Sequence, residues 1–320
     1  MAQISNTLLS YDTRAVSEHP EDVSSQIYNI DPADTPVVSL AGTRKVSNTL
    51  FEWLTEDLTA ASAGTPEVEG FETTRASSEV TNRLNNYVQI LTRNATVSGT
   101  QQALKNFGKS SQMAWQMARK SKELKRDVNY SLVHPQAANA GSGVAPGTAR
   151  QSAMLNSWIK TNVDRGAGGL NPTGDGSDVA TNGAQRILTE TLVNNVMQDC
   201  YTNGAEPTTM LVGPFNKGTV AGFGGRAISR EIIDQNMAGS NVTVYASPWG
   251  NLKIVPHRWQ QERDAWIVDP KRIRIAYLRN FQSQELSRIG DAVTRQILVE
   301  YGLQVDTEKA HGLVADLTTS

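Results

Sequence analysis

The stretch Ser98–Pro135, SGTQQALKNFGKSSQMAWQMARKSKELKRDVNYSLVHP, has the pattern that decides the fold. Ser98 is a favourable N-cap, and Gln101 follows at the capping-box spacing. Apolar and small residues then recur at three- and four-residue steps, at Leu104, Phe107, Ser111, Ala114, Ala118, Ser121, Leu124, Val128 and Leu132. Pro135 ends the pattern, so the spacing predicts one helix from Ser98 to about His134, ~50 Å long at 1.5 Å per residue. Such a helix is either a coiled coil or the spine of an elongated domain, and the inward Ser and Ala residues disfavour a strong coiled coil.

Two β-type segments precede the helix. Val46–Leu54 reads VSNTLFEWL, with Phe51 and Trp53 on one face of a strand. Leu84–Leu91 reads LNNYVQIL, which places Val88 and Ile90 on one face. The two segments predict a long hairpin with a tip of roughly 25–30 residues, and a connection of that length is either functional or disordered.

The segments on either side of this region differ in character. The first 45 residues are polar and interrupted by Pro20, Pro32 and Pro36, so we expect an arm that orders only on another surface, such as a second subunit. Residues 138–183 are rich in Gly, Ala, Asn and Ser, which predicts extended surface segments flanking a short helix near Met154–Ile159.

The C-terminal half predicts a second helix followed mainly by short strands. This helix runs from about Ala184 to Tyr201, ends at Gly204, and has its apolar stripe at Ile187, Leu188, Leu192, Val196 and Cys200. The sequence then alternates strand-like runs with turn signals, among them the hairpin turn Pro248–Asn251. The fold class is therefore α+β.

The composition excludes several classes of protein. The chain has 320 residues, 34.8 kDa, 19% charged residues and a net charge of −2, so no overall field steers it onto nucleic acid or an anionic membrane. It contains no run of ~18 apolar residues and no basic region before an apolar run at the N-terminus, which argues against a membrane helix and a signal peptide. Its one cysteine, Cys200, lies on a helical apolar stripe, which predicts a buried, inert thiol in a reducing compartment.

No constellation of catalytic, cofactor-binding or metal-ligating residues stands out, and we expect no cofactor. The four histidines are not at metal-ligand spacing and have no cysteine partner: His19, His134, His257 and His311. Gly213–Thr219 resembles a phosphate loop only loosely, because its lysine precedes the second glycine, and a strand-to-helix turn is the alternative. Gly222–Gly225 lacks the context of a dinucleotide fold. Asp175 and Asp178 could hold a cation weakly, but no EF-hand glutamate follows them.

The order of these elements resembles that of the tailed-bacteriophage major capsid (major head) proteins, which have the Hong Kong 97-like fold. The segments Asp31–Pro36, Phe51–Leu58 and Lys122–Leu132 are similar to that family as well. The resemblance implies five regions: an N-terminal arm at 1–45, an extended β-hairpin loop at 46–97, a peripheral domain with a long spine helix at 98–183, an axial domain at 184–282, and C-terminal strands returning to the peripheral domain at 283–320.

The resemblance also implies a function and partners. The chain would form pentamers and hexamers that build an icosahedral shell in the virion, assembled in the host bacterial cytoplasm. The shell would enclose double-stranded DNA without sequence-specific binding, and no membrane would be involved. Expected partners are a portal protein, optionally a decoration protein, and a separate scaffolding protein, since residues 1–45 leave no room for a fused scaffold. Some relatives cross-link autocatalytically through a loop lysine, but no lysine lies between Lys45 and Lys105, so we expect no cross-linking.

Three alternatives remain open at this point. An encapsulin-like compartment shares the fold plan, and an α+β enzyme with an unrecognised site fits the composition. A tail-tube or fibre protein fits less well, because those folds are dominated by strands.

The signs of charge segregate between the predicted loop and the predicted helix. From Val46 to Thr74 the charged residues are all acidic: Glu52, Glu56, Asp57, Glu67, Glu69 and Glu72. The helix is rich in basic residues, among them Arg119, Lys120, Lys122, Lys125 and Arg126. A solvated helix face is one interpretation of the basic run. The other is that the acidic loop docks on the basic region of the next subunit, with Phe51 and Trp53 as apolar anchors.

Overall fold

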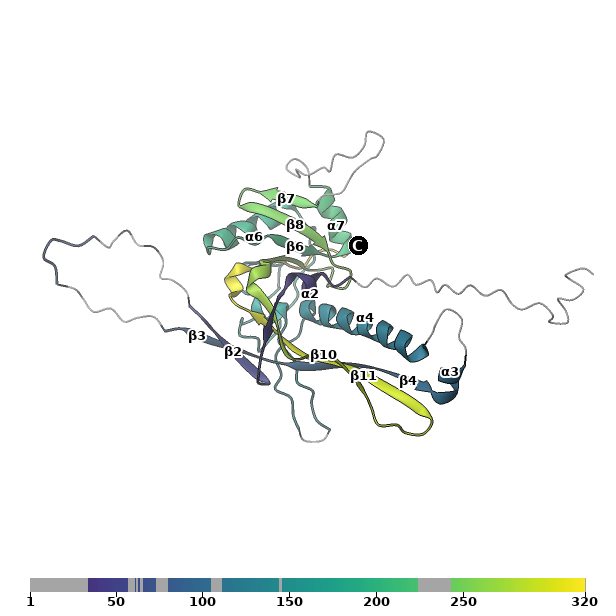
Figure 1. The fold of residues 1–320 in the computed structure, drawn as a ribbon. Coiled ribbons are helices and arrows are strands. Elements are labelled where there is room, and N and C mark those ends of the chain that lie inside the picture. Colours follow the sequence, from purple (N-terminus) through teal and green to yellow (C-terminus); the bar gives the residue numbers. More distant parts are fainter. Residues whose placement is uncertain are drawn as a thin grey trace, which may run out of the picture.

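The computed structural model describes residues 34–56, 61, 63, 66–72, 80–104, 111–143, 146–223 and 243–319. Its strands form three sheets: a four-stranded sheet in the order β1-β10-β11-β4, a six-stranded sheet in the order β5-β12-β9-β6-β8-β7, and the two-stranded ribbon β2-β3. The predicted hairpin and the α+β class are therefore present (Figure 1).

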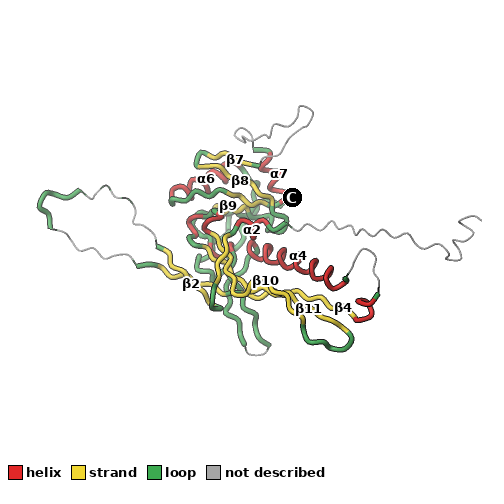
Figure 2. Tube along the Cα trace, in the orientation of Figure 1, coloured by secondary structure: helices red, strands yellow, loops and turns green. Residues whose placement is uncertain are grey.

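The four-stranded sheet and the helix α4 (Gln112–Val133) make up what we call the elongated lobe. Its strands are β1 (Gly42–Lys45), β4 (Gln89–Ser98), β10 (Ile273–Glu285) and β11 (Ala292–Val305). β11 pairs antiparallel with β10 and β4, and β1 joins β10 in parallel. Figure 2 shows α4 lying along these strands, and its buried stripe meets their inward side chains in one core, among them Leu124, Val128, Leu132, Ile275, Val299 and Leu303.

The predicted continuous helix from Ser98 to His134 is wrong, because the chain forms two separate helices there. Ser98 does cap a helix, accepting a bond from the Gln101 amide at 3.3 Å, but that helix, α3 (Gly99–Ala103), ends after five residues. Ser111, which the pattern placed on the inward stripe, is instead the N-cap of α4 and accepts from the Ala114 amide at 3.3 Å. The 22 residues of α4 correspond to ~33 Å.

The new start also changes which residues face inward at this end of α4. Met113 is buried and Met117 partly buried against the same small cluster, whereas Ala114 and Ala118 are exposed. The three- and four-residue spacing was correct only from Leu124 onward. The interpretation failed where a serine was counted as a small core residue.

The six-stranded sheet with its helices makes up the compact lobe. Its strands are short: β5 (Val163–Asp164), β6 (Thr209–Val212), β7 (Val244–Ser247), β8 (Gly250–Pro256), β9 (Ala265–Val268) and β12 (Gly312–Val314). α6 (Glu190–Thr202) packs on β12, and α7 (Pro214–Ala221) packs on β8. β7 and β8 pair as the hairpin that Pro248–Asn251 predicted.

The second helix starts later than the sequence predicted. α6 begins at Glu190, after the N-cap Thr189, whose hydroxyl accepts from the Leu192 amide at 3.4 Å. Ile187 precedes the helix and is 67% exposed. Gly204 ends the element as expected, at φ 80°.

The flanks of residues 138–183 are mostly exposed or half-buried, as their composition predicted, but the short helix between them is buried. Residues 152–159 are all buried and include the short helix α5 (Leu155–Trp158) at the predicted place. Met154 and Trp158 belong to the core of the elongated lobe. The Gly- and Asn-rich flanks hid a short apolar stretch that passes through the interior.

The strands of the two large sheets do not follow the domain boundaries that we expected from the sequence. β10 is one strand from Ile273 to Glu285, so the boundary drawn at residue 282 falls inside it. The 3₁₀ turns η1 (Pro270–Arg272) and η2 (Glu308–Ala310) lie where the chain passes between the lobes. After η2, β12 pairs with β9, so residues 283–320 contribute to both sheets.

Candidate subunit-interface surfaces

The hairpin formed by β2 (Leu50–Thr55) and β3 (Asn82–Tyr87) projects from one end of the elongated lobe (Figure 1). Its register runs from Leu50 opposite Tyr87 to Thr55 opposite Asn82. Among the described residues, it carries large apolar side chains that face solvent: Leu54 at 64%, Val68 at 76%, Phe71 at 42% and Val80 at 90% exposure. A projecting ribbon with this much exposed apolar surface is typical of a segment that another chain covers.

Most acidic residues of the hairpin have no ion-pair partner in the described part of the chain. Glu56, Glu67, Glu69 and Glu72 are exposed, and no ion pair joins them to the described part of the chain. Glu52 faces Arg83 on the opposite strand at 3.5 Å. Asp57 lies outside the described residues.

Phe51 and Trp53, which the sequence suggested as anchors on a neighbour, are buried within their own chain. They are 5% and 8% exposed, and the Trp53 ring lies 5.8 Å from Phe51 and 5.2 Å from Trp158. Phe51 also occupies the space above Gly302 on β11, where a Cβ atom would approach its ring to 2.6 Å. The two rings hold the hairpin to its own subunit and offer no apolar surface to another, so that expectation is corrected.

Asn86 fixes the root of the hairpin. Its buried side chain donates to the carbonyl oxygens of Ala153 at 3.0 Å and Leu303 at 2.6 Å and accepts from the Ala153 amide at 2.9 Å. The strand then breaks at the fully buried Val88, which leaves Ile90 44% exposed rather than on the same inward face. Sequence reasoning missed Asn86 because its partners lie 67 and 217 residues away.

Several of the basic residues predicted on the helix already have partners in the same chain. Arg119 and Lys120 both reach Glu123, at 3.4 and 2.7 Å, and Arg126 stacks on Trp259 at 5.2 Å. Burial opposes ionisation of Glu123, but its cationic neighbours outweigh burial and lower its pKa.

Two lysines on the same helix remain free. Lys122 and Lys125 are exposed and have no ion-pair partner in the described part of the chain. They are therefore the basic residues of α4 that are best placed to meet a second molecule.

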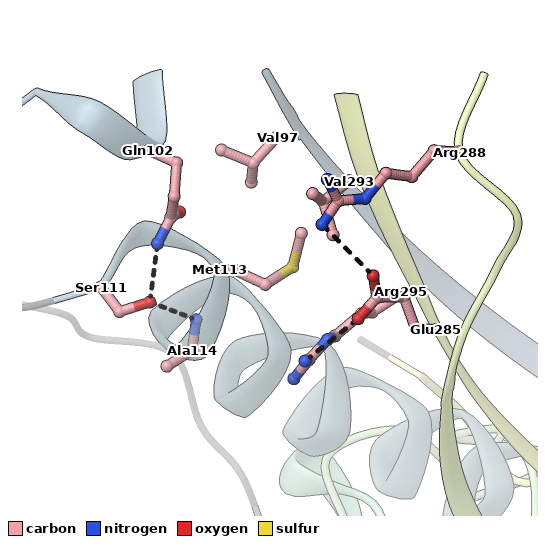
Figure 3. Close-up of a pocket in the computed structure, with 9 residues that line it drawn as sticks. All are labelled: Val97, Gln102, Ser111, Met113, Ala114, Glu285, Arg288, Val293 and Arg295. Carbon is pink, nitrogen blue, oxygen red and sulfur yellow. Dashed lines mark hydrogen bonds and ion pairs between the residues drawn. The ribbon is translucent and has the colours of Figure 1, made fainter. Parts of the chain in front are cut away.

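A second basic surface lies at the other end of the elongated lobe and was not predicted. We call it the distal pocket; it measures about 240 Å³, and Figure 3 shows the residues that line it: Val97, Gln102, Ser111, Met113, Ala114, Glu285, Arg288, Val293 and Arg295. Its apolar side chains come from β4, α4 and β11. Arg288 and Arg295 share one carboxylate, Glu285, at 3.8 and 3.3 Å, which leaves an excess of positive charge. The lining residues come from four separate segments, so no local sequence motif could have predicted the pocket.

Several titratable groups that the sequence singled out are buried or already hydrogen-bonded. Burial raises the pKa of the Cys200 thiol to about 12 and lowers the pKa of His311 to about 3. The carboxylates of Asp175 and Asp178 accept bonds from Thr173 at 2.7 and 2.5 Å. No group of three or more potential metal ligands occurs in the described ranges.

The loosely phosphate-loop-like segment and His134 have structural surroundings that need no ligand. Gly213 is the N-cap between β6 and α7, and Pro214–Thr219 belong to α7, so the strand-to-helix alternative is confirmed. His19 lies outside the described residues, and His134 stacks on Tyr130 at 5.0 Å. None of the helices that the structure describes is long and apolar enough to cross a membrane.

One family model matches almost the whole chain, and a curated relative matches about a third of it. The family model described as SU10 major capsid protein matches residues 3–318. The major capsid protein of Escherichia phage Phieco32 is 32% identical over 108 residues, which are 34% of this chain and only about a third (31%) of that protein.

Solved structures agree in fold at low sequence identity. A structure from Microbacterium phage Oxtober96 has a TM-score of 0.61 at 13% identity, covering 96% of this chain and 98% of that one. The capsid of a native GTA particle gives 0.62 at 13% identity, covering 98% and 100%. The holo-SrpI encapsulin complex from Synechococcus elongatus PCC 7942 gives 0.56 at 11% identity, covering 97% and 96%.

Proposed function

The chain belongs to the SU10 major capsid protein family and has the Hong Kong 97-like fold, and on that premise we propose that it forms pentamers and hexamers that close an icosahedral shell around double-stranded DNA. One observation carries the proposal: the exposed glutamates lie on the hairpin that precedes β4, and the distal pocket with Arg288 and Arg295 lies at the far end of β4. Surfaces that complement each other head to tail generate rings when the rotation closes. An encapsulin-like compartment uses the same fold, but the family match favours a virion shell.

In this proposal each region has a role in the shell. Residues 1–45 are the arm, whose last strand β1 joins the sheet of the elongated lobe, and the hairpin within 46–97 is the extended loop. The elongated lobe is the peripheral domain, with α4 as its spine, and the compact lobe is the axial domain around the five- and six-fold axes. The groups follow the sheets, so β10 belongs to the peripheral domain and β12 to the axial one.

The extended loop docks on the elongated lobe of the next subunit through charge and apolar contact. Glu67, Glu69 and Glu72 meet basic side chains there, while the neighbouring Val68 and Phe71 lose their exposure. The receiving surface runs from Lys122 and Lys125 on α4 toward the distal pocket with Arg288 and Arg295. Each exposed pair contributes ~0.2–1 kcal/mol, so three pairs give ~0.6–3 kcal/mol per contact, repeated at every interface of the shell.

Reversal of charge on the loop tests this docking. The variant Glu67→Lys/Glu69→Lys/Glu72→Lys should impair assembly without unfolding the free subunit, as measured by light scattering and circular dichroism. Reversing Lys122 and Lys125, or Arg288 and Arg295, in the same chain should restore part of the assembly.

A matched control separates docking from net charge. Glu67→Lys/Glu69→Lys and Asp199→Lys/Glu206→Lys change the net charge equally, and all four residues are exposed. Only the first pair should slow assembly. If the triple loop variant assembles like the wild type at low and moderate salt, the docking proposal is wrong.

The shell is expected to hold without covalent links. No lysine lies between Lys45 and Lys105, so the amine nucleophile of an isopeptide bond is missing from the loop. A net charge of −2 suits a shell that encloses DNA without binding it tightly. A scaffolding protein, a portal and a decoration protein remain proposed partners, with assembly in the bacterial cytoplasm.

A further inference from the structure

We propose that Asn129 is the positioning residue for the arm: it fixes the base of the arm to both lobes, and it does so only while His257 is neutral. The base of the arm is the helix α2 (Pro36–Leu40), which lies between α4 and the compact lobe in Figure 1. The inference rests on the proposed function only in naming the residues before α2 an arm.

Asn129 supplies the N-terminal cap that α2 lacks. The N-cap residue Thr35 makes no side-chain cap bond, and Pro36 has no amide hydrogen. The first free amides of the helix are therefore those of Val37 and Val38, and both donate to Asn129 Oδ1, at 2.9 and 3.3 Å. A side chain 91 and 92 residues away therefore accepts the cap hydrogen bonds that a local Ser, Thr or Asp usually accepts.

The same amide group also engages the compact lobe. Because Oδ1 is taken by two amides, the Nδ2 group must donate to His257 Nε2, which lies 2.6 Å away. His257 follows β8 directly, and both His257 and Asn129 are 0% exposed. One side chain thus ties α2, α4 and the loop 257–259 together.

His257 can take part only in its neutral form. A second donor, the Trp259 amide, faces Nδ1 at 3.2 Å, so two N–H groups point at a ring that has a single acceptor when neutral. A second proton on the ring would make both ring nitrogens N–H donors. Nε2–H would then face the Asn129 Nδ2–H group, and Nδ1–H would face the Trp259 amide. Burial lowers the pKa of His257 to about 4, in the same direction as this geometry.

The charged groups at the junction come from all three segments. Arg126 of α4 stacks on Trp259, and Arg258 of the loop pairs with Asp34, just before α2, at 3.3 Å. Both arginines have the same sign of charge as a protonated His257, and Asp34 is paired with Arg258 and largely exposed. Acidification therefore acts on the link through His257, and the expected consequence is loss of the Asn129 bond pair and release of α2.

Hydrogen–deuterium exchange of the free subunit tests this inference independently of shell assembly. Asn129→Ala should make the Val37 and Val38 amides exchange about tenfold faster, while strand β11 keeps its protection. Tyr130→Ala, at the adjacent exposed position, is the control and should leave both amides unchanged.

The pH profile separates positioning from simple packing. After correction for intrinsic exchange, wild-type protection of Val37 and Val38 should fall as the pH drops from about 6.5, where a released His257 takes up a proton, to about 4, and level off below that pH. His257→Gln keeps an acceptor but cannot be protonated, so it should keep the protection at that pH. Unchanged exchange in Asn129→Ala, or the same acid midpoint in wild type and His257→Gln, overturns the proposal.

Discussion

Replacing Trp53 by alanine should destabilise the free subunit by ~3–5 kcal/mol, the usual cost of removing a buried Trp or Phe side chain. The structure supports a value in this range. Trp53 is 8% exposed and packs on Trp158 and Phe51, and its Nε1 atom has no hydrogen-bond partner among the described residues, so the loss is one of packing alone. An aromatic side chain buries ~150–250 Å², which at ~25 cal/mol/Å² corresponds to ~4–6 kcal/mol as an upper bound.

Leu54 is the matched control for this experiment. It is the next residue of the same strand, points to the other face and is 64% exposed, so Leu54→Ala should change stability by ~0.5 kcal/mol or less. Urea unfolding of the free subunit, followed by circular dichroism, gives both values. If Trp53 served as an anchor on a neighbour instead, Trp53→Ala would spare the free subunit and weaken only assembly. A Trp53→Ala cost no larger than that of Leu54→Ala refutes the reasoning.

Three further outcomes follow from buried or missing groups. Burial raises the pKa of Asp264 to about 7, so the folded state keeps a proton that the unfolded chain loses near 4, and stability should fall as the pH rises from 4 to 7 and then level off. Urea unfolding at a series of pH values should show that Asp264→Asn lacks this loss, and parallel profiles would contradict it. The Cys200 thiol should react with iodoacetamide only on unfolding, because burial raises its pKa to about 12; rapid labelling of the native chain would be inconsistent with this. Boiled, reduced shells should run as one band near 34.8 kDa, and a ladder of covalent oligomers would show cross-linking.

The parts of the fold that local pattern controls could be predicted from the sequence. The alternation around Phe51 and Trp53 gave the strand β2, and the strand pairing followed because a second alternating run came later in the chain. Gly204 and the turn at Pro248–Asn251 were correct because their backbone geometry is set by the residues themselves. The order of elements was enough to indicate the capsid fold.

The predictions that were wrong share one physical cause. Where the local pattern is compatible with two structures, tertiary contacts decide which of them forms. Ser111 fits a helix interior or an N-cap, and only its bond to the Ala114 amide selects the cap. The side on which Trp53 is buried depends on Trp158, more than a hundred residues away. The distal pocket and the Asn129–His257 link join distant segments and leave no trace at any fixed spacing.

Cryo-electron microscopy of particles assembled from this chain would show directly whether the hairpin docks on a neighbouring subunit. We expect a closed icosahedral shell of pentamers and hexamers in which the hairpin tip around Glu67–Glu72 of one subunit lies on the elongated lobe of the next. Density for Phe71 should be covered by that neighbour, close to Lys122 and Lys125 or to the distal pocket. Particles without closed icosahedral order, or a hairpin that contacts only its own subunit, would contradict the proposed shell and its docking contact.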